Sequence, residues 1–289
     1  MLHKMIRNFA PLAAIAMSAA LAGCDGMDVR INDEDAVPLA ELDMSGDPPT
    51  ELALVAPDTV ILTEGDALDI TLEGDEDAID ALRFTNSDGT LGIVRESGRW
   101  KDTGQAIVRV TMPAPEAISI AGSGSVESAR MATNAAINIA GSGSVDVSAF
   151  DSEMLEVSMG GSGKVTGTGS AERIEISSAG SGQVDLAGLT TERAEVSIVG
   201  SGDVRFASDG DVEASIAGSG SVYVTGSATC TVSSVGSGKL VCENKSAAEA
   251  AEEEVAAKKA AAKAKQTKAK KKVAKKVAKK AGAKKPRKA

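Results

Sequence analysis

The sequence predicts an all-β protein built on a parallel β-helix-like solenoid with about 19 residues per coil. Three observations lead to this fold class: the tripeptide Gly-Ser-Gly recurs seven times from Gly122 onward, its first glycines are 18 to 20 residues apart, and aliphatic residues flank it at even offsets. A fixed period of this length is typical of a solenoid in which each repeat forms one coil. Strand side chains alternate between two faces, so the even offsets place the aliphatic residues on one interior face.

The two glycines of each triplet are expected to mark a bend where the backbone lies too close to the interior for a side chain. These repeat-turn glycines are Gly122, Gly124, Gly141, Gly143, Gly161, Gly163, Gly180, Gly182, Gly200, Gly202, Gly218, Gly220, Gly236 and Gly238. Aliphatic columns are expected four residues before and after each first glycine, as at Ile137 and Val145. The central serines should form a ladder on the exterior. A stack of antiparallel hairpins, the alternative, does not explain why the even-offset pattern runs unbroken through the triplet.

Residues 1–23 resemble a bacterial lipoprotein signal peptide. Lys4 and Arg7 precede a short uncharged apolar run, which ends in Leu21-Ala22-Gly23-Cys24. The run is too short to span a bilayer permanently, but it suits a secretory signal. In lipoproteins the cysteine that matches Cys24 carries the lipid, so the resemblance implies a membrane anchor in the bacterial cell envelope. Ordinary cleavage nearby, with Cys24 an incidental thiol, is the alternative, and the choice of inner or outer membrane stays open.

The following segment, 24–56, is acidic, contains three prolines and has no sustained periodicity, which predicts a tether. The β-solenoid domain is expected over residues 57–243. Within it, the acidic cluster from Asp75 to Asp80 lacks the glycine-punctuated spacing of a calcium loop. We therefore expect a solvated turn at that cluster.

The run from Ala106 to Val126, AIVRVTMPAPEAISIAGSGSV, resembles the putative auto-transporter adhesin head GIN domain family, also called DUF2807. The similarity extends over about Glu51 to Glu243, and its signature recurs seven times. The resemblance implies a right-handed β-helix-like fold in a bacterial envelope protein, here a lipoprotein. The lysine-rich extension after this region is a departure from the family pattern.

Cys230 and Cys242 are a candidate disulfide. They lie six residues before and six after Gly236, so both have the inward parity of the last coil. An oxidising periplasm permits a bond there. Two buried thiols that act as small hydrophobic side chains are the alternative. Two thiols without histidine do not supply enough ligands for a metal site, and no cofactor is expected.

Residues 244–289 differ sharply in composition from the rest of the chain. Lys258–Ala289 carries 15 lysines, one arginine and no acidic residue, a charge of +16, whereas the charge between Cys24 and Ala257 is −28. Self-repulsion predicts a basic tail that is disordered, or helical only when a polyanion binds. The expected polyanion-binding residues are Lys270, Lys271, Lys272, Lys275, Lys276, Lys279, Lys280, Lys284, Lys285, Arg287 and Lys288.

Three partners fit this basic tail. Anionic lipid headgroups or lipopolysaccharide are accessible to an exported protein, and each lysine near a membrane contributes roughly 1 kcal/mol. DNA, the nucleic-acid alternative, would bind without base specificity but normally lies in another compartment. The third partner is the acidic body of the protein itself.

Catalysis is not expected. The only histidine, His3, lies in the signal segment, and aromatic residues make up 2% of the chain. The exposed column after each triplet contains a single carboxylate, Asp203, so no acid pair converges there. We expect a non-catalytic, adhesin-like or surface-binding envelope lipoprotein, with an envelope scaffold that binds protein partners as the alternative. A polysaccharide-processing enzyme and a DNA-binding protein rank below both.

Overall fold

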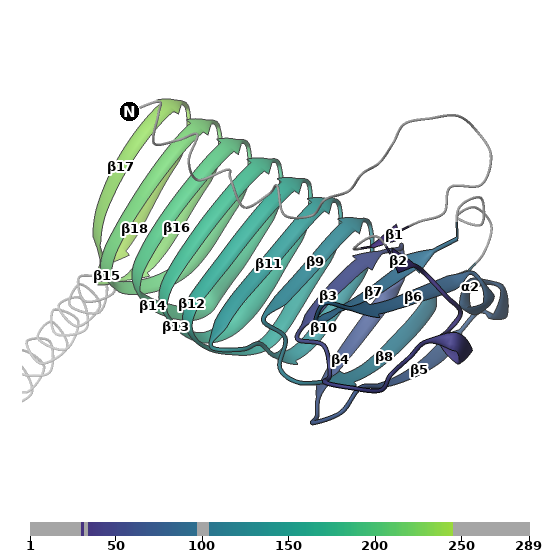
Figure 1. The fold of residues 1–289 in the computed structure, drawn as a ribbon. Coiled ribbons are helices and arrows are strands. Elements are labelled where there is room, and N and C mark those ends of the chain that lie inside the picture. Colours follow the sequence, from purple (N-terminus) through teal and green to yellow (C-terminus); the bar gives the residue numbers. More distant parts are fainter. Residues whose placement is uncertain (1–29, 32–33, 97–103, 245–289) are drawn as a thin grey trace, which may run out of the picture. The chain divides into compact units, whose positions relative to one another are not determined.

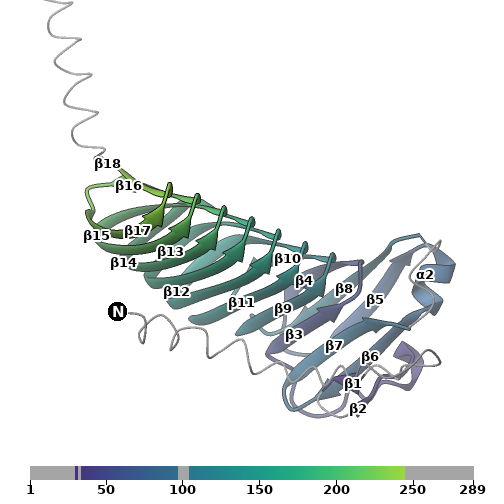
Figure 2. The ribbon, with the colours of Figure 1, turned by 90° about the horizontal axis from the view of Figure 1, so that it is seen from above.

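The structure is a computed structural model that describes residues 30–31, 34–96 and 104–244. The chain divides into two compact units, Met1–Glu243 and Asn244–Ala289. In the described part, strands of successive coils lie side by side as a parallel β-solenoid, of which about seven turns carry the Gly-Ser-Gly triplet (Figures 1 and 2), and this confirms the predicted fold class. The signal peptide, Cys24 and the tail residues 245–289 lie outside the described residues. No helix in the described ranges is long and apolar enough to cross a membrane.

Each coil contributes strands to two parallel ladders that meet at a Gly-Ser-Gly corner. The upstream ladder contains the residues that lead into each corner, and the downstream ladder those that follow it. The strands are β9 (Ala117–Gly122), β10 (Ser125–Arg130), β11 (Asn134–Gly141), β12 (Ser144–Gly161), β13 (Lys164–Gly180), β14 (Gln183–Gly200), β15 (Asp203–Gly218), β16 (Ser221–Gly226), β17 (Thr229–Gly236) and β18 (Lys239–Asn244). Strands β12 to β15 pass through both ladders. Pairing is shifted by one repeat, so Ile137 lies between Ile118 and Val157.

The corners require glycine for two reasons. The first glycines all have φ between 118° and 134°, a region that side chains disfavour. At Gly141, a Cβ would also overlap the carbonyl oxygen of Gly122 in the preceding coil. At Gly163, the second glycine of its triplet, a Cβ would lie 2.7 Å from Ile139 Cγ2. All seven central serines are exposed as predicted: Ser123, Ser142, Ser162, Ser181, Ser201, Ser219 and Ser237.

Aliphatic side chains between the two ladders form the core. The predicted columns are buried in six of the seven repeats, namely Ile118, Ile137, Val157, Ile176, Val196 and Ala214 before the corner, and Val126, Val145, Val165, Val184, Val204 and Val222 after it. The seventh repeat differs, because Val232 in β17 is 49% exposed. Among the described residues, β17 pairs only with β15, so no further coil covers this side chain.

Two more coils precede the first Gly-Ser-Gly. Strands β3 (Glu51–Val55) and β4 (Thr59–Glu64) pair with β9 and β10, and β7 (Thr90–Arg95) and β8 (Ala106–Met112) stack beyond them. The expected tether over 24–56 therefore needs correction, because β3 belongs to the upstream ladder. Its Leu52 and Leu54 are buried, but five residues are too short a strand to give a sustained pattern.

Antiparallel strands close this N-terminal end. Strand β5 (Asp69–Gly74) pairs with β8, and β6 (Leu82–Ser87) pairs with β7. The acidic cluster between them is a short helix, α2 (Glu76–Asp80), rather than the expected turn, because the Asp75 side chain accepts a hydrogen bond from the Asp77 N–H at 3.0 Å and so caps it. The remaining elements are the strand pair β1 (Arg30–Ile31) and β2 (Glu34–Asp35), and a 3₁₀ turn, η2 (Leu39–Glu41).

The corner between β3 and β4 has Ala56-Pro57-Asp58 in place of Gly-Ser-Gly. Asp58 takes the place of the second glycine and is fully buried. Its Oδ1 accepts hydrogen bonds from Arg95 Nη2 at 2.5 Å and from the Ala106 N–H at 2.8 Å. Arg95 is only 1% exposed, so this corner is held by a buried ion pair. Burying two charges is tolerated only when they are paired and hydrogen-bonded.

Candidate functional site

At the second corner, where the chain passes from the downstream to the upstream ladder, buried hydroxyl groups lie at the bend in three of the coils. Ser152, Thr191 and Ser208 occupy aligned positions in β12, β14 and β15. The hydroxyl of Ser152 donates to the Ala132 carbonyl at 3.1 Å, and that of Thr191 to the Glu172 carbonyl at 3.2 Å. These bonds give the two backbone carbonyl groups side-chain donors where the strands bend.

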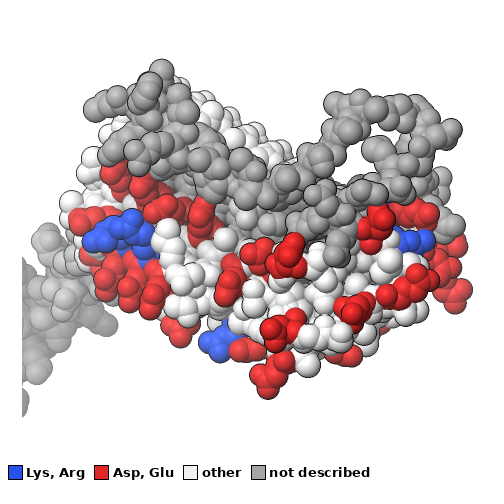
Figure 3. Space-filling view, viewed as in Figure 1, with Lys and Arg blue, Asp and Glu red and all other residues white. Residues whose placement is uncertain are grey.

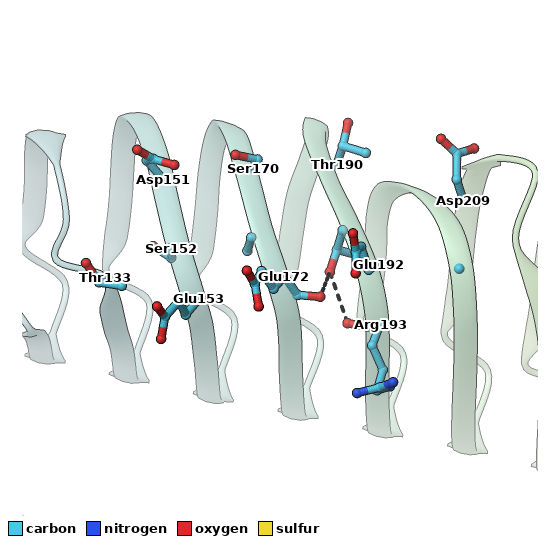
Figure 4. A pocket seen from close by; sticks show the side chains of 13 residues that line it. Thr133, Asp151, Ser152, Glu153, Ser170, Glu172, Thr190, Glu192, Arg193 and Asp209 are labelled. Atoms are coloured by element: carbon cyan, nitrogen blue, oxygen red, sulfur yellow. Dashed lines mark hydrogen bonds between the residues drawn. The ribbon is translucent and has the colours of Figure 1, made fainter.

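A concavity of about 850 Å³ runs along this corner over four coils. Its rim carries five exposed carboxylates, one or two from each of the strands β12 to β15 (Figure 4). We call these residues the acidic strip: Asp151, Glu153, Glu172, Glu192 and Asp209. The three glutamates of the strip, Glu153, Glu172 and Glu192, recur at intervals of 19 and 20 residues, so the repeat itself places them in one row. Arg193 lines the same concavity.

A second row of glutamates lies on the outward side of the upstream ladder. Glu156, Glu175, Glu195 and Glu213 pair strand to strand in consecutive coils. Like charges directly opposite one another on neighbouring strands are destabilising. Arginine lies between this row and the acidic strip: Arg173 Nη1 is 3.3 Å from Glu175 Oε1. This pair is partly exposed, so it contributes little stability and leaves the surface acidic.

Acidic side chains are spread widely over the solenoid, with basic side chains set among them (Figure 3). Because the acidic strip is open to water along its length, its carboxylates can attract cationic groups and accept hydrogen bonds from hydroxyl groups. In the part of the chain that the structure describes, no group of three or more His, Cys, Asp or Glu side chains could hold a metal ion. The arrangement is therefore suited to binding an extended ligand along several coils.

The exposed column that follows each Gly-Ser-Gly triplet lies on the downstream ladder, on another side of the coil. Its residues align as predicted: Ser125, Ser144, Lys164, Gln183, Asp203 and Ser221. Asp203 accepts a hydrogen bond from the Ser221 N–H at 3.1 Å. This column contains one carboxylate, Asp203, and the carboxylates of the acidic strip lie elsewhere, at the second corner. The recurrence of Glu153, Glu172 and Glu192 at the glycine period was the signal that identifies the acidic strip.

The remaining candidate residues lie at the C-terminal end or beyond it. Cys230 and Cys242 are joined as a disulfide between β17 and β18, with their Cα atoms 6.7 Å apart. Lys239 begins β18 and is exposed. The expected lipidation site Cys24 and the polyanion-binding residues from Lys270 to Lys288 are outside the described ranges, so the structure does not place them.

Three solved structures from Bacteroides and Parabacteroides species have a similar fold. A putative adhesin from Bacteroides fragilis is 23% identical with a TM-score of 0.62, over 68% of this chain and 92% of that one. A putative lipid binding protein from Parabacteroides distasonis is 21% identical with a TM-score of 0.54, over 68% and 93%. A putative adhesin from Parabacteroides merdae is 15% identical with a TM-score of 0.52, over 68% and 92%. At these identities the likeness establishes the fold.

No curated protein matches the sequence. The family model described as "Putative auto-transporter adhesin, head GIN domain" matches residues 48–228, which is more than half of the chain. This match confirms the resemblance seen in the repeats. The chain therefore belongs to the DUF2807 family of head GIN domains.

Proposed function

We propose that this protein is a non-catalytic, adhesin-like binding protein of the bacterial cell envelope, anchored by lipid at Cys24. One observation carries the proposal: the acidic strip is open and continues over four stacked coils, as a surface for an extended ligand would. Successive coils are spaced about 4.8 Å apart, so four of them present acceptor groups over roughly 14 Å. The adhesin descriptions of the family and of two structural relatives support this role.

The ligand of the acidic strip is expected to carry cationic or hydroxyl groups, as many surface polysaccharides do. The test is binding of the full chain to immobilised neutral, amino-substituted and acidic glycans. Replacing Glu153, Glu172 and Glu192 together by glutamine should reduce binding to the amino-substituted glycans at least tenfold. The matched control replaces Asp146, Asp185 and Asp203 on the downstream ladder by asparagine, which removes the same charge from another surface. Equal losses in the two triple variants would contradict the proposal, and turnover of any glycan would favour an enzyme.

The basic tail is proposed to hold the protein to anionic lipids, lipopolysaccharide or another envelope polyanion. Its charge of +16, against −28 for the chain between Cys24 and Ala257, supports this. One structural relative is described as a putative lipid binding protein, which adds support for a lipid partner. The Cys24→Ser variant of the full chain lacks the proposed lipid, so its binding to phosphatidylglycerol vesicles and to lipopolysaccharide reports on the tail and should weaken steeply with salt. Removing Lys258–Ala289, or replacing its basic residues by glutamine, should abolish it.

Two outcomes would contradict this role for the tail: binding that is insensitive to salt, or binding that survives both tail variants. Tighter binding to duplex DNA than to either envelope polyanion would favour the nucleic-acid alternative. If Cys24 is the anchor, Cys24→Ser should release the full chain from the membrane fraction at high salt, where the basic tail no longer holds it, while the native chain stays bound. Retention of that variant on membranes at high salt would point to another anchor.

A further inference from the structure

The last coil of the solenoid leaves its edge uncovered in the described structure. In β17 every side chain except that of Cys230 is exposed. Val232 and Val235 are 49% and 76% exposed, the two highest values among the exposed large hydrophobic side chains. Among the described residues, β17 pairs only with β15, and β18 only with β16. An edge of this kind presents backbone N–H and C=O groups that can accept another strand.

The two ends of the solenoid differ in how their edges are protected. At the N-terminal end, β5 and β6 run antiparallel and carry charges, including Glu73, which pairs with Arg109 at 3.0 Å. At the C-terminal end, β17 has the sequence TCTVSSVG, which contains neither a charged residue nor a proline. Charge and proline are the usual devices that keep edge strands from pairing. The C-terminal edge lacks them in β17.

The charges of β18 are arranged so that the strand complements itself. Lys239 and Glu243 are exposed and, at an even separation, point to the same outward side of the strand. They are equally distant from Val241. In an antiparallel pairing of two β18 strands centred on Val241, each Lys239 therefore lies opposite the other copy's Glu243. Opposite charges at directly paired positions stabilise a ladder.

The antiparallel pairing of two β18 strands has a two-fold axis at Val241, and the same axis can relate two copies of β17. The two strands run toward and away from the corner at Gly236, so residues equally distant from it face each other, as the disulfide between Cys230 and Cys242 shows. Thr231 and Val241, each five residues from Gly236, accordingly lie at the same level of the two strands, with their side chains outward. An axis through Val241 then also passes Thr231, and only uncharged residues of β17 meet there. The disulfide holds both strands as one rigid edge, which lowers the entropic cost of association.

We propose that two copies of this chain associate end to end through β17 and β18, extending both ladders as antiparallel pairs about a two-fold axis. The association covers Val232 and satisfies the open backbone groups of the terminal coil. Closed two-fold pairing leaves the antiparallel N-terminal ends outward, so the assembly stops at two copies. This proposal is independent of the ligand of the acidic strip and of the tail.

The test is the mass of the full chain, solubilised in detergent, measured by sedimentation equilibrium over a range of concentrations. Lys239→Glu and Glu243→Lys should each raise the dimer dissociation constant roughly tenfold, because each change makes two attractive pairs repulsive. The double variant with both changes should restore the native value. The matched control is Lys164→Glu, which alters the same repeat position in an interior coil and should leave the constant unchanged.

A second variant does not depend on the charge pair. Thr231→Lys places two like charges across the proposed axis and should also weaken the dimer. Because all three substituted side chains are exposed, far-UV circular dichroism should show unaltered strand content in each variant. A native chain that is monomeric at all concentrations would overturn the proposal, whatever else covers the edge. A dimer that tolerates the single reversals, or a double variant that does not recover, would overturn it too.

Discussion

Replacing Gly161 by alanine should destabilise the solenoid more than the same change at Gly122. Both glycines open a Gly-Ser-Gly corner, and their φ angles are 122° and 118°. A side chain strains the backbone equally at the two positions, at a cost of about 1–3 kcal/mol. The positions differ in what a Cβ would meet: at Gly161 it overlaps the Gly141 carbonyl oxygen, whereas at Gly122 nothing lies within 4 Å.

The difference between the two variants therefore isolates the close approach of one coil to the next. Forcing a methyl group against backbone typically costs a further 1–3 kcal/mol or so. We expect a loss of about 1–3 kcal/mol in the free energy of unfolding for Gly122→Ala, and about 2–6 kcal/mol for Gly161→Ala. Urea unfolding followed by far-UV circular dichroism measures both, provided that the m-values agree with that of the native chain. Equal losses would refute the reasoning, since the stacking of corners would then not be what requires glycine.

Three further predictions concern the corners and the end of the solenoid. Asp58→Ala should lower the free energy of unfolding by about 3–5 kcal/mol, because Arg95 stays buried but loses the carboxylate that neutralises its charge. A urea midpoint within error of the native value would contradict this. Glu172→Gln should raise the free energy of unfolding by about 0.2–1 kcal/mol, because it relieves repulsion between carboxylates of the acidic strip. A lower melting temperature would show instead that the Glu172 charge stabilises the fold. Replacing Cys230 and Cys242 together by serine should lower the free energy of unfolding by about 3 kcal/mol at most. Amide hydrogen exchange should become faster in β17 and β18, while β12 to β14 stay protected. Uniform loss of protection would show that the terminal coil does not unfold as a separate unit.

Periodicity explains how much of the fold could be predicted from the sequence. The glycine corners, the serine ladder and the columns at Ile137 and Val145 repeat at one spacing, so each repeat supports the others. The coil made by β3 and β4 could not be found that way, because Asp58 occupies a glycine position and its partner Arg95 is far away in the sequence. Parity also says which side chains point inward, but not where the stack ends. For that reason Val232 was expected in the core and is exposed.

The candidate site was predictable in principle. Glu153, Glu172 and Glu192 recur with the same period as the glycines, so the sequence alone indicates that they form one row. What periodicity does not supply is the bend at the second corner, which brings Asp151 and Asp209 to the same rim. That bend depends on the buried hydroxyls of Ser152, Thr191 and Ser208, whose spacing varies from coil to coil.

The stacking of coils in register can be tested by engineered cross-links. Ser177 and Ser197 are directly paired on the outward side of the upstream ladder, whereas Ser177 and Ser215 are two coils apart. Neighbouring strands are about 4.8 Å apart, within the Cα separation of a disulfide, and next-but-one strands at roughly 9.6 Å are beyond it. The account predicts that S177C/S197C forms an additional disulfide on oxidation, seen by intact-mass spectrometry, and that S177C/S215C does not. A bond in the second pair, or none in the first, would contradict the one-repeat register on which the solenoid rests.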